Sequence, residues 1–119
     1  MLLLCYKRCG TCREVEKILS EKGLTAGSGY EYRHIDVDNP TYEELKLWHE
    51  TSGLDIKRFF NTSGLVYRRL GLKDKLSSMS LDEKYTILSE DGLLVKRPIL
   101  VLDDGVYVGA DVKKRLESV

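Results

Sequence analysis

The stretch Tyr6-Lys7-Arg8-Cys9-Gly10-Thr11-Cys12-Arg13 joins an apolar run to a helical pattern and decides the fold. The run from Leu2 to Tyr6 has the length and composition of a buried strand. From Arg13 onward the apolar residues recur at helical spacing, so the two cysteines lie where a strand passes into a helix. We expect Cys9 at or just before the first helical turn, and Cys12 on the same side of the helix.

A thiolate is favoured at this junction, because the first turn of a helix has free amide groups and the positive end of the helix dipole. Three basic side chains nearby, Lys7, Arg8 and Arg13, would lower the pKa of the accessible cysteine further. We therefore interpret Cys9 as a nucleophile and Cys12 as its resolving partner, and we expect the two to form a redox disulfide.

Other interpretations of the cysteine pair stay open. A structural zinc site needs four thiolate or imidazole ligands, usually as two spaced pairs, and neither His34 nor His49 belongs to a second pair, so we expect no metal. A permanent structural disulfide needs an oxidising compartment, and two inert core cysteines remain an alternative. Cys5 lies inside the apolar strand and is expected to be a buried, unreactive thiol.

The composition indicates an ordinary globular chain. Its 119 residues are the size of one domain with a core of its own. Lysine and arginine together number 19, equal to aspartate and glutamate, so the net charge is zero and we expect no direct contact with nucleic acid. The amino-terminal apolar run is too short for a signal peptide, and no stretch approaches the about 18 apolar residues of a membrane span. We expect a cytoplasmic protein that does not bind membranes.

The first part of the chain predicts a strand, a helix and a second strand. The helix is amphipathic and is expected to end near Gly23. Residues 25–29 are small and glycine-containing, which is typical of a loop. The segment from Tyr30 to Val37 is rich in β-favouring residues and predicts a strand parallel to the first, because a helix joins the two.

The middle of the chain, about residues 41–92, predicts a helical insertion. Capping boxes, Thr41 with Glu44 and Ser80 with Glu83, begin two of its helices, and Asp91-Gly92 is expected to end the second. The run Tyr67-Arg68-Arg69 is expected to face outward. The apolar residues expected to be buried between the two helices are Ile56, Phe59, Phe60, Leu65, Val66 and Leu70.

Strand character returns after the insertion. The apolar runs from Pro98 to Leu102 and from Val106 to Val108 are joined by Asp103-Asp104-Gly105, which predicts an antiparallel hairpin. Asp111 is expected to cap a final helix. The order β-α-β, helical insert, β-β-α predicts a thioredoxin-like α/β fold with a mixed sheet, and we expect residues 1–119 to form a single domain.

Arg97-Pro98 stands at the start of this hairpin. A proline is tolerated at the beginning of a strand, which explains Pro98 without any function. In thioredoxin-like folds, however, a cis proline at this place lies against the Cys-X-X-Cys motif and leaves backbone groups free for a substrate thiol or disulfide; a cis X-Pro bond is uncommon. Arg97 would then lie near Cys9 and pair with an oxyanion or stabilise the thiolate, the alternative being a solvated surface arginine.

Several motifs together carry a family resemblance over nearly the whole chain. They are Cys9-Gly10-Thr11-Cys12, Asn39-Pro40-Thr41, Glu43-Glu44-Leu45, Phe59-Phe60-Asn61-Thr62-Ser63-Gly64, Tyr67 with Leu70-Gly71-Leu72, and Lys96-Arg97-Pro98-Ile99. With these motifs the chain resembles the arsenate reductase and Spx family of thioredoxin-fold proteins, and it is most similar to the uncharacterised reductase-like members.

The resemblance implies a set of site residues. The glutaredoxin-coupled arsenate reductases have one catalytic cysteine, which matches Cys9, and three arginines around the oxyanion. Arg97 matches one arginine, whereas Asn61 and about Ala110 occupy the other two positions, which leaves arsenate reduction itself an open question. No bound cofactor is implied, and glutathione, glutaredoxin or thioredoxin would be the reductant. The residues expected to bind the substrate, a small oxyanion or a thiol or disulfide, are Thr11, Asn61 and Pro98.

Two functions follow from the same residues. In a thiol-disulfide oxidoreductase, the Cys9 thiolate attacks the substrate, Cys12 resolves the intermediate and Arg97 stabilises negative charge. In the Spx branch, the disulfide of a paired Cys-X-X-Cys is a switch in a protein that binds the RNA polymerase α subunit, which would make this chain a redox-sensing transcriptional regulator. We favour the first function, and an inactive binding module ranks last.

Overall fold

The computed structural model describes residues 1–118, whose contacts group into two compact units. The first unit contains Met1–His34 and the chain from Arg97 onward, and the second is Ile35–Lys96. The second unit corresponds to the predicted helical insertion, with slightly wider bounds. That the whole chain forms a single domain stays a prediction. No helix among the described residues has both the length and the apolar character needed to cross a membrane.

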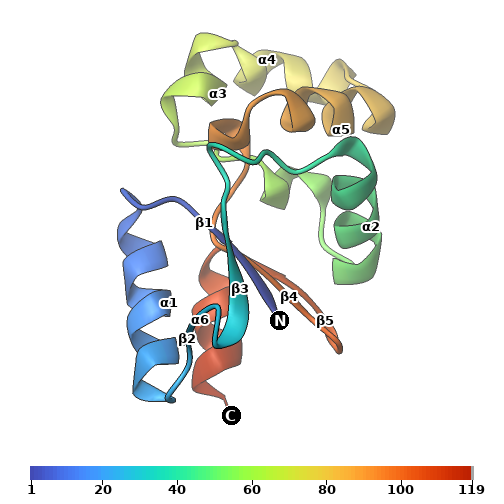
Figure 1. Cartoon of the computed structure of the whole chain (residues 1–119). Coiled ribbons are helices and arrows are strands. Elements are labelled where there is room, and N and C mark those ends of the chain that lie inside the picture. Colours follow the sequence, from blue (N-terminus) through green and yellow to red (C-terminus); the bar gives the residue numbers. More distant parts are fainter. Residues whose placement is uncertain (119) are drawn as a thin grey trace. The chain divides into compact units, whose positions relative to one another are not determined.

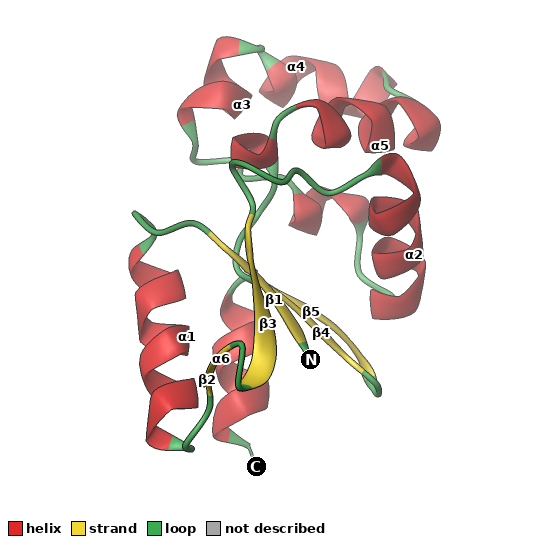
Figure 2. Cartoon of the chain, in the orientation of Figure 1, coloured by secondary structure: helices red, strands yellow, loops and turns green. Residues whose placement is uncertain are grey.

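The first unit is built on a five-stranded mixed sheet in the order β2-β3-β1-β4-β5 (Figure 2). The central strand β1 (Leu2–Cys5) is parallel to β3 (Gly29–His34) and antiparallel to β4 (Ile99–Leu102). β5 (Gly105–Val108) completes the predicted hairpin with β4. The mixed sheet and the order of its strands confirm the predicted fold class.

Two predicted boundaries in this sheet are wrong. The expected loop at residues 25–29 contains the two-residue strand β2 (Thr25–Ala26), which pairs in parallel with the start of β3. β3 ends at His34, before the predicted end at Val37. The prediction extended too far because Ile35 and Val37 are β-branched and favour strands. Ile35 instead begins the second unit, and Val37 is 81% exposed.

Two helices, α1 (Gly10–Glu21) and α6 (Ala110–Glu117), lie against each other and pack on the sheet (Figure 1). Because β1 alternates its side chains between two faces, Leu3 and Cys5 point to the same side. Cys5 on β1 and Cys12 on α1 both belong to the buried core of this unit. Its buried residues are Leu3, Cys5, Cys12, Val15, Leu19, Tyr30, Leu100, Val112 and Leu116.

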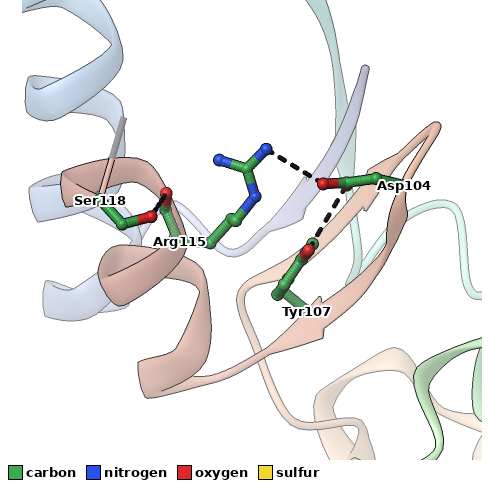
Figure 3. A network of polar contacts seen from close by, with 4 residues as sticks. All are labelled: Asp104, Tyr107, Arg115 and Ser118. Atoms are coloured by element: carbon green, nitrogen blue, oxygen red, sulfur yellow. Dashed lines mark hydrogen bonds and ion pairs between the residues drawn. The ribbon is translucent and has the colours of Figure 1, made fainter.

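The last helix, α6, begins earlier than predicted. Gly109 is its N-cap, with a φ of 63° that glycine adopts at low cost, and the expected cap Asp111 lies in the first turn. The far end of α6 contacts the β4–β5 turn, since Arg115 Nη2 lies 3.2 Å from Asp104 Oδ2 and the guanidinium lies 5.7 Å from the ring centroid of Tyr107 (Figure 3). The carboxylate of this ion pair is exposed, so the contact orients the turn but contributes little stability.

The second unit is helical. Both predicted capping boxes are present, at Thr41 with Glu44 and at Ser80 with Glu83. The two helices that they begin pack together, and His49 Nδ1 lies 2.6 Å from the hydroxyl of Tyr85. The elements are α2 (Tyr42–Ser52), η1 (Ile56–Phe59), α3 (Leu65–Arg69), α4 (Leu72–Lys75), η2 (Leu76–Ser78), α5 (Leu81–Glu90) and η3 (Gly92–Leu94), of which the η elements are 3-10 turns.

Burial in α3 differs from the prediction. Leu65 is 75% exposed and Leu70 is 38% exposed, whereas Tyr67, which was expected to face outward, is only 6% exposed. Val66 is buried as predicted. A helix of five residues is too short for its apolar spacing to define which face is buried. The other residues predicted to be buried in this region, Ile56, Phe59 and Phe60, are buried.

Gly92 follows the end of α5 at Glu90, as predicted, but its main role is to permit a close approach of two backbone segments. A Cβ atom at this position would lie 1.7 Å from the carbonyl oxygen of Ile35. Glycine is therefore required here by packing between segments far apart in the sequence.

Replacement of this glycine tests that account. Gly92→Ala should lower the free energy of unfolding by about 3 kcal/mol, because neither backbone segment can move away without disturbing its neighbours. Gly10→Ala is the matched control, since nothing lies within 4 Å of the added methyl group and its effect should stay within about 0.5 kcal/mol. Urea unfolding followed by circular dichroism measures both, and equal midpoints for the two variants would contradict the close approach.

Candidate functional site

Cys9 and Cys12 lie where β1 passes into α1, in agreement with the predicted junction. Cys9 is the N-cap of α1, and its side chain makes no capping hydrogen bond. Its amide donates to the carbonyl of Tyr6 at 2.9 Å, and its carbonyl accepts from the amide of Arg13 at 3.2 Å. The amides of the first turn have no partner earlier in the helix.

The cysteines differ in accessibility. Cys9 is half-buried, whereas Cys5 and Cys12 are both 0% exposed, and all three are unpaired thiols in the structure. A reagent in solvent can therefore reach Cys9 first, and Cys12 is reached from within the protein. The roles of Cys9 as nucleophile and of Cys12 as resolving thiol stay predictions.

The pKa-lowering contacts in the structure converge on Cys12. A hydrogen bond from the Cys5 thiol lowers the pKa of Cys12 to about 7, burial opposes this change, and the Tyr6 amide, the Cys9 side chain and the charge of Arg97 add to it. The Tyr6 amide donates to Cys12 Sγ at 3.4 Å. The same hydrogen bond and burial raise the pKa of Cys5 far above its ordinary value. Cys5 therefore holds its proton more tightly than Cys12 does.

Two of the three basic residues predicted to favour a thiolate, Lys7 and Arg13, contact other groups. Lys7 Nζ lies 3.8 Å from Glu16 Oε1, and Arg13 Nε donates to the carbonyl of Lys7 at 3.2 Å. These contacts hold the two cations beside the first turns of α1. The cation whose charge lowers the pKa of Cys12 is Arg97.

Arg97 reaches this site through the register of the sheet. β4 runs antiparallel to β1 with Leu4 opposite Ile99, so continuation of the register places Arg97 opposite Tyr6. The guanidinium carbon of Arg97 lies 5.0 Å from the ring centroid of Tyr6, within the range of a cation–π contact.

The Arg97–Pro98 peptide bond is cis, and Pro98 is buried. Arg97 is half-buried, unlike a fully solvated surface arginine.

The two other predicted substrate-binding residues are placed differently. Thr11 is exposed in the first turn of α1. Asn61 belongs to the helical unit, where its amide donates to the carbonyl of Leu94 at 2.8 Å and its carbonyl accepts from the amide of Gly64 at 3.0 Å. Asn61 therefore organises a turn of the helical unit. Contact of Thr11, Asn61 and Pro98 with a substrate stays a prediction.

The histidines lie in different units. His34 ends β3, edge-on to Tyr32 with 4.8 Å between ring centroids, and His49 contacts Tyr85 in the helical unit. Within residues 1–118, no group of three or more His, Cys, Asp or Glu side chains is arranged to hold a metal ion.

Sequence reasoning missed three residues around the cysteine pair. Cys5 was assigned to the core, and its hydrogen bond to Cys12 was not expected, although the core-facing alternation of β1 could have indicated it. Tyr6 supplies both an amide donor and a ring for Arg97. The hydroxyl of Tyr32 is buried and has no hydrogen-bond partner within residues 1–118, and burial raises its pKa.

The role of Cys5 can be tested through the ionisation of Cys12. In a Cys9→Ser background, we expect the pKa of Cys12 to stay below the ordinary value of a thiol, and Cys5→Ala should raise its thiolate midpoint by at least about one unit, because the largest lowering contact is lost. Cys5→Ser keeps a hydroxyl donor and should change the midpoint less. Ultraviolet thiolate absorbance against pH measures all three, and an unchanged midpoint in Cys5→Ala would contradict the assignment.

Comparison with known proteins places this geometry in a family. A profile of the ArsC family matches residues 4–117. The uncharacterised protein YusI of Bacillus subtilis strain 168 is 48% identical over 104 residues, which cover 87% of this chain and 85% of YusI. A crystal structure of an ArsC family related protein from Bacteroides fragilis is 44% identical, with a TM-score of 0.86 over 97% of this chain and 95% of that chain.

Two more distant relatives carry the names of regulators. The regulatory protein MgsR of Bacillus subtilis strain 168 is 29% identical over 106 residues, covering 87% of this chain and 78% of MgsR. The global transcriptional regulator Spx of Staphylococcus epidermidis is 25% identical over 101 residues, covering 85% of this chain and 72% of Spx. The family profile spans nearly all of the described residues, and the chain belongs to the ArsC family.

Proposed function

We propose that this chain is a thiol-disulfide oxidoreductase that uses Cys9 and Cys12 as its redox pair. The observation that carries the proposal is a half-buried thiol at the N-cap of α1, followed one turn later by a buried thiol whose pKa is lowered to about 7. Reactive cysteines typically occupy such partly exposed, electropositive positions at helix starts.

The proposed reaction has two exchange steps. The Cys9 thiolate attacks one sulfur of a disulfide substrate, the substrate S–S bond breaks, and the first leaving thiolate takes a proton from water. The Cys12 thiolate then attacks the Cys9 sulfur, which releases the second substrate thiol and leaves a Cys9–Cys12 disulfide. Two electrons have passed from the pair to the substrate. Glutathione, glutaredoxin or thioredoxin returns them, as expected in a reducing cytoplasm.

Residues around the pair would support each step. The lowered pKa of Cys12 favours its thiolate, so Cys12 would attack without a separate base. Arg97, held over the ring of Tyr6, supplies positive charge that favours thiolates and would favour an oxyanion in the same place. The free amides of the first turn of α1 add donors on the side of Cys9.

Variants with one cysteine replaced at a time test this sequence of events. With glutathione disulfide, the wild-type chain should end with a Cys9–Cys12 bond, whereas Cys12→Ser should retain a glutathione adduct on Cys9, because no resolving thiol is present. Cys9→Ser should form neither product, and its turnover of a small disulfide should fall about 100-fold or more. Cys5→Ala keeps both reacting sulfurs and should still form the internal disulfide, but more slowly, because Cys12 loses the contact that lowers its pKa. Mass spectrometry of the intact and digested protein measures the products.

A different pattern would contradict the proposal. If the adduct appears on Cys12 in the wild-type chain, or if Cys9→Ser turns over substrate at the wild-type rate, Cys9 is not the nucleophile. If peroxide and glutathione disulfide both leave Cys9 and Cys12 as free thiols, the two are not a redox pair.

A redox-sensing transcriptional regulator is the second candidate function. It is favoured by the similarity to MgsR and Spx, and by the resemblance that implies binding of the RNA polymerase α subunit. In this case the same disulfide would change a binding surface, and no substrate would be turned over.

Parallel assays of turnover and binding distinguish the two functions. We expect reduction of a small disulfide with glutathione and glutaredoxin, weak arsenate turnover because only Arg97 matches the three implied arginines, and no capture by the RNA polymerase α subunit. The measurements are coupled turnover assays and a pull-down of reduced and oxidised protein, with Cys9→Ser as the control. If the RNA polymerase α subunit captures only the oxidised protein, and no substrate is turned over, the regulator is the correct function and the enzyme is not.

A further inference from the structure

The helical unit contains a cavity of about 210 Å³ that the proposed redox chemistry does not use. Its walls come from the segment around η1, from α3, from α4 and η2, and from α5, all within Ile35–Lys96. The volume equals that of about seven water molecules, and it is below the range of pockets that enclose drug-sized ligands. The cavity therefore suits a small molecule or a single side chain.

The floor of the cavity is apolar. Ile56, Phe60 and Leu76 line it, and their exposed fractions are 8%, 2% and 7%. These side chains belong to the core of the helical unit, so the floor is a fixed surface. An apolar group placed on it would be removed from water, which is favourable in proportion to the area covered.

One polar group in this wall lacks a partner. Tyr67 is 6% exposed and lines the cavity, yet its hydroxyl forms no hydrogen bond within residues 1–118. It does not belong to the fully buried polar atoms, so it can be reached from the cavity. Buried hydroxyl groups normally find a hydrogen-bond partner, and a ligand in the cavity would supply one.

The rim of the cavity is positively charged. It carries Lys57, Lys73 and Lys84, against one carboxylate, Asp55, which already accepts the amide of Lys57 at 2.9 Å. None of the three ammonium groups forms an ion pair or hydrogen bond within the described part of the chain, and Lys84 is half-buried. Charges of one sign around a concave surface attract an ion of the opposite sign.

A second, wider hollow continues the basic surface. It shares Asp55, Lys57 and Phe60 with the cavity and adds Lys96. A ligand that leaves the cavity at this side would therefore still lie among cations.

We propose that this cavity is a binding site for a small amphipathic carboxylate. Its apolar body, about the size of one aromatic ring, lies on Ile56, Phe60 and Leu76. Its carboxylate accepts a hydrogen bond from the hydroxyl of Tyr67 and pairs with Lys73 and Lys84 on the rim. The inference needs no cysteine, so it holds or fails separately from the redox function.

Titration with matched probes tests the site in the whole chain. Phenylacetate should give saturable shifts at the amides of Phe60, Tyr67 and Leu76 in two-dimensional NMR spectra, and the neutral phenylacetamide should bind about tenfold more weakly, since it lacks the charge. Inorganic phosphate, which lacks the apolar body, should also bind more weakly. The Cys9→Ser variant should bind phenylacetate as the wild-type chain does.

Variants assign the contacts. Lys84→Gln and Lys73→Gln should each weaken phenylacetate binding about threefold to tenfold, and Tyr67→Phe, which removes only the hydroxyl, about threefold. Lys46→Gln, on α2 and outside the lining, is the matched control and should bind as the wild-type chain does. The exposed Lys73 provides a second charge variant if Lys84→Gln does not fold.

Three results would overturn the proposal. The first is an absence of saturable shifts at the cavity up to ~10 mM phenylacetate. The second is equal affinity for phenylacetamide or for inorganic phosphate, and the third is an equal effect of Lys46→Gln and Lys73→Gln.

Discussion

The antiparallel register between β1 and β4 is the constraint on which the site depends. With Leu4 opposite Ile99, the chain that follows β1 and the chain that precedes β4 meet at the same end of the sheet. This pairing brings Arg97 to Tyr6, and through it a positive charge to Cys12. A slip of one residue would move every side chain of the strand to the opposite face, which would remove both the cation and the core position of the cysteines.

The three cysteine sulfurs at this end of the sheet have different environments and, we propose, different roles. Cys9 is reached from solvent at the start of α1, whereas Cys12 lies in the core one turn later. The hydrogen bond between Cys5 and Cys12 raises the pKa of Cys5 and lowers that of Cys12, so a buried thiol contributes to the ionisation of its neighbour. The low pKa is thus found at the proposed resolving thiol, where it would speed closure of the internal disulfide.

Local patterns in the sequence were sufficient for much of the fold. The strand-to-helix junction, both capping boxes and the final hairpin depend on residues close together in the chain, and all are present. Features set by distant segments were not predictable in the same way. The carbonyl of Ile35 beside Gly92, the inward face of Tyr67 and the pairing of Lys7 with Glu16 arise only once the elements pack. Cys9 and Cys12 could be found from spacing alone, but the partners that tune Cys12 could not.

The central claim, that Cys9 is the reactive thiol, is tested most directly by competition among the three cysteines for a limiting amount of iodoacetamide. The reduced, folded chain is labelled at neutral pH, and the label on each cysteine is measured by mass spectrometry, with a denatured sample as the reference. The account predicts label on Cys9 while Cys5 and Cys12 stay unlabelled. Equal labelling of all three, or label on Cys12 before Cys9, would contradict it.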